Sequence, residues 1–179
     1  GGYINGYAGD DVRLQDRFFE GASSFRGFEV AGVGPRLLFA NPDRSPRLTD
    51  PADPNSDWVG RALGAKTYAI GTAEILLPLP LPDEYGIRAS LFTDFGVVGS
   101  LDTASKVLNN DISNFLDTDG DGIGDFAPVQ DEMAFRATAG ISVSWDSPFG
   151  PVRFDFAEII RKERYDQTEG FRFSAGTNF

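Results

Sequence analysis

The last ten residues of the chain alternate between two kinds of side chain. Residues 170–179 read G-F-R-F-S-A-G-T-N-F. One face of an extended chain would carry Phe171, Phe173, Ala175, Thr177 and Phe179. A period of two over this length is typical of a β-strand, because successive side chains of a strand point to opposite faces. We therefore expect a strand with one apolar face and one polar face.

The same alternation recurs upstream. It is clear in 87–96, 135–145 and 152–158, and weaker in 64–77 and near 1–8. Charged residues fall on the polar faces, and they include Glu74, Arg88, Asp94, Arg136, Arg153, Asp155 and Arg172. The sequence therefore predicts an all-β fold of about six strands.

The segments between these strands differ greatly in length. Residues 78–85 and 146–151 are short and rich in turn-forming residues, whereas 9–63 and 97–131 are long and polar. Short turns at one end and long loops at the other are typical of antiparallel, up-and-down barrels of the outer membrane. We expect 97–131 to be an acidic external loop.

A soluble β-sandwich would show the same alternation, so that fold stays an alternative. Strand length and the aromatic-rich apolar faces favour membrane strands, which need about ten residues at a tilt. A closed transmembrane barrel needs about eight strands. We therefore interpret 1–179 as the C-terminal part of a single transmembrane β-barrel domain whose early strands lie outside this sequence.

Composition excludes several classes of function. The net charge is −11, which argues against nucleic acid as a partner because phosphate contacts need basic surface. The chain has no histidine and no cysteine, so thiol chemistry and histidine-based triads or zinc sites are ruled out. Glu74 and Asp94 are possible paired carboxylates, but no nucleophile or base accompanies them, so we do not expect an enzyme.

The long stretch 9–63 contains an unusual aromatic segment. Residues 16–28 read D-R-F-F-E-G-A-S-S-F-R-G-F, and 32–36 read G-V-G-P-R. Surface loops are usually polar, but here four phenylalanines flank Arg26. Apolar side chains are stabilised by leaving water, so we expect the segment to fold back and pack.

This segment resembles the signature loop of the BamA family, the barrel-assembly factors of the bacterial outer membrane. TamA and the two-partner secretion transporters share its R-G-F core. Four further motifs resemble the family in the expected order: E-x-x-x-P over 74–78, F-x-D-x-G over 92–96, W-D-S-P-F-G-P over 145–151 and the terminal aromatic Phe179. The resemblance covers essentially the whole chain, with 9–63 as the signature loop and the start of the next strand.

The resemblance implies a particular site. In the family the loop enters the barrel lumen and its arginine meets acidic groups of the inner wall. Here the loop motif is Phe25, Arg26, Gly27 and Phe28. The wall partners of Arg26 would be Asp94 and Glu74, and both lie on predicted polar faces. A guanidinium group suits this role because its planar fork stays charged and can bind two carboxylates.

The resemblance also gives the final strand a role. In the family the last strand pairs weakly with the first, and this seam is thought to open toward lipid. Gly176 matches a kink-forming glycine, and Phe179 matches the terminal aromatic of the outer-membrane targeting signal. Glycine weakens a strand and permits a bend, and a free strand edge can recruit another strand.

One acidic segment departs from the family pattern and resembles a calcium loop. The candidate ligands are Asp117, Asp119, Asp121, Ile123 (through its carbonyl) and Asp125. Position twelve is Pro128 rather than the usual bidentate glutamate. Calcium therefore stays a possible ligand, and a flexible acidic loop is the alternative. We expect no required cofactor.

The resemblance implies the central barrel component that folds and inserts β-barrel proteins into the outer membrane of a Gram-negative bacterium. Expected partners are outer-membrane lipid and lipopolysaccharide, nascent β-barrel proteins and accessory assembly lipoproteins. The family's periplasmic POTRA domains are not in this sequence. A TamA-like or two-partner secretion transporter is one alternative, and a soluble calcium-binding β-sandwich module is another.

Overall fold

The computed structural model describes residues 1–6, 12–37, 61–100, 129–148 and 150–176. These residues form mostly strands: β1 Gly2–Tyr3, β2 Arg36–Leu37, β3 Arg61–Ala62, β4 Thr67–Leu77, β5 Ile87–Gly99, β6 Phe135–Ser147, β7 Gly150–Arg161 and β8 Phe171–Ala175. Two short 3-10 turns, η1 Leu14–Asp16 and η2 Asp83–Tyr85, accompany them. No helix of the described residues is long and apolar enough to cross a membrane.

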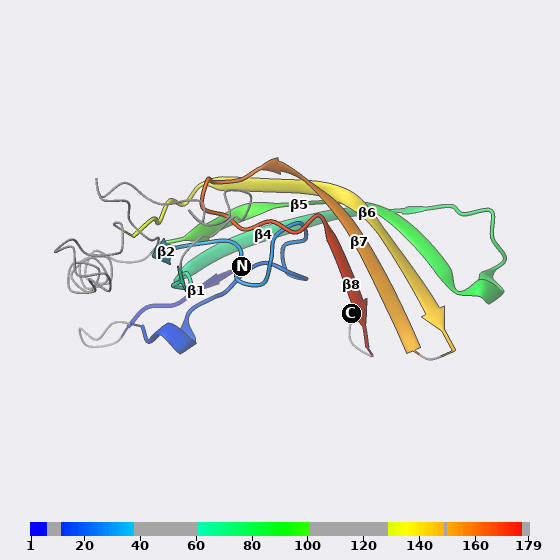
Figure 1. The fold of residues 1–179 in the computed structure, drawn as a ribbon, viewed down its shortest axis with the longest axis horizontal. Helices are drawn as coiled ribbons and strands as arrows, with labels where there is room; N and C mark the ends of the chain where they lie inside the picture. Colours follow the sequence, from blue (N-terminus) through cyan, green and yellow to red (C-terminus); the bar gives the residue numbers. More distant parts are fainter. Residues whose placement is uncertain (7–11, 38–60, 101–128, 149, 177–179) are drawn as a thin grey trace, which may run out of the picture.

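The main sheet has six strands in the order β1-β4-β5-β6-β7-β8. Every neighbouring pair is antiparallel, and each of the strands β4 to β7 pairs with the next in sequence. Figure 1 shows these long strands side by side in one strongly curved sheet. The predicted all-β, up-and-down arrangement is therefore confirmed. β2 and β3 form a separate small pair.

The covered face of the sheet is polar and the exposed face is apolar, which is the reverse of a soluble domain. On β5 the buried residues include Ser90 and Asp94, while Leu91 and Phe95 are exposed. Other large apolar side chains that are exposed on the strands include Ile75, Ile141, Trp145, Phe156, Phe171 and Phe173. In a soluble sandwich the apolar face would be the covered one. An apolar outer face and a polar inner face are expected where the outer face meets lipid.

The inner face is covered by residues 20–34, which we call the signature segment. Phe25, Phe28 and Val33 of this segment pack with Ala65 and Val98 into a buried apolar cluster. The rings of Phe25 and Phe28 lie edge to face, with centroids 4.8 Å apart. Phe25 and Phe28 therefore do what the sequence predicted, because they leave water by packing against the sheet, whereas Phe19 stays 42% exposed. Figure 1 shows the chain around this segment running along one face of the curved sheet.

Several element boundaries differ from the expectation. β5 extends to Gly99, so its end lies inside the range 97–131 that we assigned to the acidic loop. The extension follows from packing, since Val98 is fully buried in the apolar cluster. Near the N-terminus we expected a strand over about 1–8; within the described residues 1–6 the strand is Gly2–Tyr3, and 7–8 lie outside the described residues. β8 ends at Ala175, and Phe179 lies outside the described residues.

Candidate functional site

Arg26 projects from a tight coil of the signature segment onto the inner face of the sheet. The coil is closed by backbone hydrogen bonds, in which the amides of Ala22 and Phe28 donate to the carbonyls of Phe28 (2.9 Å) and Phe25 (3.3 Å). Gly27 has φ +91°, a backbone angle that favours glycine. The turn therefore directs Arg26 toward the wall, where only 6% of the residue is exposed.

Asp94 of β5 is the main partner of Arg26. The Nε and one terminal nitrogen of Arg26 donate to the two carboxylate oxygens at 2.8 and 2.7 Å. The backbone amide of Arg26 donates to the same carboxylate at 3.1 Å, and the hydroxyl of Thr72 adds a bond of 2.8 Å. Asp94 is 1% exposed. Bidentate, charge-assisted bonds of this kind are among the strongest that side chains make.

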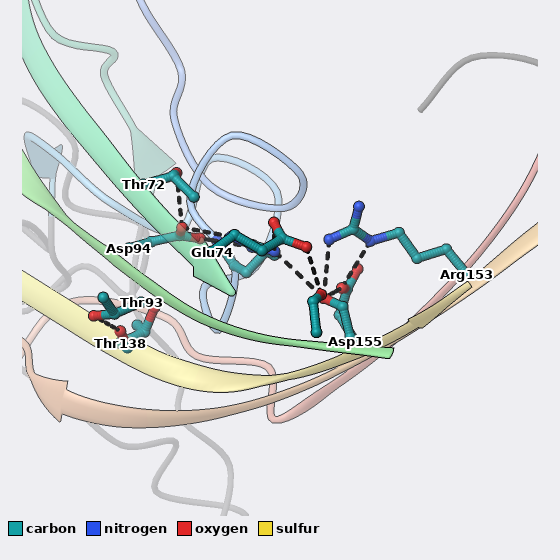
Figure 2. A network of polar contacts seen from close by, with 10 residues as sticks. Thr72, Glu74, Thr93, Asp94, Thr138, Arg153 and Asp155 are labelled. Atoms are coloured by element: carbon teal, nitrogen blue, oxygen red, sulfur yellow. Dashed lines mark hydrogen bonds and ion pairs between the residues drawn. The ribbon is translucent and has the colours of Figure 1, made fainter. Parts of the chain in front are cut away.

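Glu74 of β4 is the second partner. The other terminal nitrogen of Arg26 lies 3.3 Å from a Glu74 oxygen, and the hydroxyl of Ser90 donates to the other oxygen. The Arg26 guanidinium also stacks on the ring of Phe92 at 3.6 Å, which stabilises the cation. Figure 2 shows Glu74 and Asp94 converging on the same region from β4 and β5.

Ser142 of β6 extends this network to β7. Its hydroxyl accepts from Arg26 at 3.3 Å and from Arg153 at 2.9 Å, and it donates to Asp155. Arg153 also donates to Asp155 at 2.9 Å. A hydroxyl has one proton and two lone pairs, so these three bonds use the full capacity of Ser142. Figure 2 shows Arg153 and Asp155 meeting next to the Glu74 side chain.

The network keeps Arg26 charged. Burial by itself lowers the pKa of Arg26, but the hydrogen bonds and negative charges of Asp94 and Glu74 outweigh it and raise this pKa above its ordinary value. The arrangement thus holds a buried cation between carboxylates. Such a site can anchor a loop.

The structure therefore brings together six of the residues singled out from the sequence: Phe25, Arg26, Gly27, Phe28, Glu74 and Asp94. Gly176 lies apart from them, at the end of β8, where its amide donates to Pro151. Phe179 and the candidate calcium ligands Asp117, Asp119, Asp121, Ile123 and Asp125 lie outside the described residues, so the calcium site stays a prediction. Within the part of the chain that the structure describes, no group of three or more acidic side chains could hold a metal ion.

The sequence analysis gave no site role to Thr72, Ser142, Arg153 or Asp155. Arg153 and Asp155 did carry a signal, since both alternate onto a predicted polar face. Ser142 and Thr72 carried none, because small hydroxyl residues occur on any polar face. Their role follows only from the register that sets β4 beside β5 and β6 beside β7.

Comparison with known proteins places the chain in a family. The model of the Omp85 superfamily domain matches residues 1–179. The chain belongs to the Omp85 superfamily. Two relatives, each described as outer membrane protein assembly factor BamA, are similar over nearly the whole chain. The protein of Neorickettsia risticii is 28% identical over 99% of this chain, and that of Neisseria meningitidis serogroup B is 30% identical over 97%.

A solved structure agrees with the sequence matches. The crystal structure of BamA from Haemophilus ducreyi lacking POTRA domains 1–3 aligns with a TM-score of 0.63 and 26% identity, covering 96% of this chain and 29% of that one. The chain spans 18% and 21% of the length of the two BamA relatives. The Omp85 chain described here therefore corresponds to a part of such a protein.

Ser142→Ala tests the link between Arg26 and β7. The substitution removes the hydroxyl that accepts from Arg26 and Arg153 and donates to Asp155. We expect the free energy of unfolding of the full-length protein in detergent to fall by roughly 1–3 kcal/mol, because buried polar groups lose a bond. Ser144→Ala, two residues along the same face of β6, is the control. Equal stability of the two variants would contradict the assigned role of Ser142.

Proposed function

We propose that this chain is the C-terminal part of the barrel of an outer-membrane protein assembly factor in a Gram-negative bacterium. Its task is to fold β-barrel proteins and insert them into the outer membrane. The observation that carries the proposal is Arg26, held by Asp94 and Glu74 so that an aromatic loop stays on the polar face of the sheet. The similarity of the whole chain to two assembly factors supports it.

The proposed mechanism breaks no covalent bond. β8 is paired with β7 on one side, and its other edge can offer backbone N–H and C=O groups to a strand of an incoming protein. The apolar outer face borders lipid. The anchored signature segment fills the inner face and keeps the wall in shape while strands are exchanged. Gly176, with φ +156°, gives the end of the last strand freedom to bend.

Partners follow from this function. Nascent β-barrel proteins are the substrates, outer-membrane lipid and lipopolysaccharide surround the wall, and accessory lipoproteins bind the assembled machine. A TamA-like or two-partner secretion transporter is the alternative within the same superfamily. The two relatives described as assembly factors favour the first function.

Depletion of the full-length protein in its own host tests the proposal. We expect the folded, heat-modifiable forms of many outer-membrane β-barrel proteins to disappear from the membrane, while soluble periplasmic proteins stay at normal levels. A return of all of them on re-expression is the control. Loss of a single secreted protein, with normal barrel proteins, would instead indicate a two-partner secretion transporter.

A further inference from the structure

A second buried ion pair lies on the inner face, apart from Arg26. Arg136 of β6 donates to the two carboxylate oxygens of Asp166 at 2.7 and 3.0 Å. Neither side chain is exposed at all. The remaining terminal nitrogen of Arg136 donates to the carbonyls of Val98 and Ala134 at 3.3 and 3.1 Å. All three nitrogens of the guanidinium are thus bonded, two of them to the Asp166 carboxylate and the third to backbone carbonyls.

Asp166 belongs to residues 162–170, which join β7 to β8 and which we call the β7–β8 connection. The Asp166 carboxylate also accepts from the amide of Glu163 at 2.7 Å, while the Asp166 amide donates to the carbonyl of Glu163 at 3.2 Å. Tyr165 is 4% exposed, and its hydroxyl accepts from the amide of Glu132 at 3.2 Å. The first part of the connection is therefore a compact turn held against the wall.

The second part of the connection binds the backbone of the signature segment. The amide of Gln167 donates to Gly32 at 3.0 Å, and the amide of Glu29 donates to Gln167 at 3.1 Å. The amide of Glu169 donates to Gly27 at 2.9 Å. These bonds resemble a short antiparallel ladder, with an isolated bridge between Phe28 and Thr168.

The signature segment is consequently enclosed from two directions. A Cβ placed on Gly27 would lie 3.0–3.1 Å from atoms of Thr138, Ala157 and Ile159 on the wall. The carbonyl of the same Gly27 faces the amide of Glu169 in the connection. Residue 27 thus touches the wall and is bonded to the connection, and the segment has no room to shift toward the sheet.

We propose that Arg136 and Asp166 are positioning residues for the signature segment. They hold the β7–β8 connection in the one place where its amides and carbonyls can bind residues 27–32. This is a second means of fixing the segment, and it uses none of the atoms that bind Arg26 to Asp94. Backbone bonds between two irregular segments depend on such an anchor, because ordering both segments costs conformational entropy.

The backbone bonds between the β7–β8 connection and the signature segment also link that segment to the last strand. The connection leads directly into β8 at Phe171, and Glu169 also pairs with Arg172 at the start of that strand. A displacement of β8 would therefore pull on the bonds to residues 27–32. The consequence for assembly activity rests on the proposed function, whereas the positioning of the segment does not.

Asp166→Asn in the full-length protein in detergent tests the proposal by residue-level hydrogen exchange. The substitution keeps the shape but removes the charge. We expect the amides of Glu29, Gln167 and Glu169 to exchange at least about tenfold faster, because their partner segment is released. The amide of Arg26, bound to Asp94, should change less than about twofold. Asp146→Asn, which removes an exposed partner of Arg88, is the matched control. It should leave the exchange rates of all these amides unchanged.

Two results would overturn the proposal. One is faster exchange confined to 162–166 with the Glu29 amide unchanged, which would make the pair a local feature of the connection. The other is Arg26→Ala exposing the Asp166 amide, which would show that the two ion pairs are not separate. If Asp166→Asn does not yield folded protein, Arg136→Lys keeps the charge but loses the fork of donors, and unchanged exchange at Glu29 in that variant overturns the proposal equally. None of these measurements depends on assembly activity, so failure here is distinct from failure of the proposed function.

Discussion

Arg26→Ala is expected to abolish the function of the full-length protein and to release the signature segment from the wall. The substitution removes the bidentate bonds to Asp94 and the contact with Glu74, leaving Asp94 as a buried charge. Breaking a buried pair in this way costs roughly 3–5 kcal/mol, so we expect the segment to leave the wall far more often, although its backbone bonds to the β7–β8 connection remain. The measurement is growth of cells that depend on the variant, together with protease sensitivity of residues 20–34.

Two further variants make this result specific. Arg26→Lys keeps the charge, but an ammonium cannot reproduce the fork that binds Asp94 while also reaching Glu74 and Ser142. We expect it to restore only part of the function. Arg88→Ala on β5, the strand that carries Asp94, removes an exposed pair with Asp146 and should be nearly neutral, as exposed pairs contribute little. Full function of Arg26→Ala would contradict the assigned role of the site.

Gly27→Ala is expected to have the second largest effect. The residue has φ +91°, where a side chain costs about 1–3 kcal/mol. The added Cβ would also lie 3.0–3.1 Å from Thr138, Ala157 and Ile159, so the segment would have to move away from the wall. That movement weakens the adjacent bonds of Arg26. We expect a loss of docked segment and of growth nearly as large as for Arg26→Ala.

Gly150→Ala is the matched control for this prediction. Gly150 also has a positive φ, +119°, but a Cβ there would meet no atom of the described residues within 4 Å. It therefore carries the backbone cost without the steric one. Thermal unfolding and protease sensitivity of both variants separate the two effects. If Gly27→Ala is no worse than Gly150→Ala, the close approach to the wall is unimportant.

Much of the fold was predictable because strand alternation is a local property. Side chains two apart share a face whatever the rest of the chain does, so the polar faces carrying Glu74, Asp94 and Asp155 could be assigned from sequence. Strand ends were less accurate. Val98 extends β5 because of packing against Phe25 and Phe28, and such contacts leave no mark in the alternation itself.

The candidate site was predicted in part, and through a different kind of signal. Arg26 with Asp94 and Glu74 came from a motif resemblance that the polar-face assignment supported. Ser142 was missed because a serine on a polar face is unremarkable until it lies between two arginines. Asp166 was missed because it lies in an irregular connection, where no periodicity indicates which way a side chain points.

The sequence by itself determined the strands, the face on which each charged residue lies, and the aromatic segment that must leave water. These depend on neighbours along the chain and on the balance between apolar and polar side chains. Only the tertiary structure decided which charges meet. The pairs Arg26–Asp94 and Arg136–Asp166 join residues far apart in sequence. They form because the signature segment and the β7–β8 connection, which lie outside the strands, fold back onto the inner face of the sheet that carries Asp94 and Arg136.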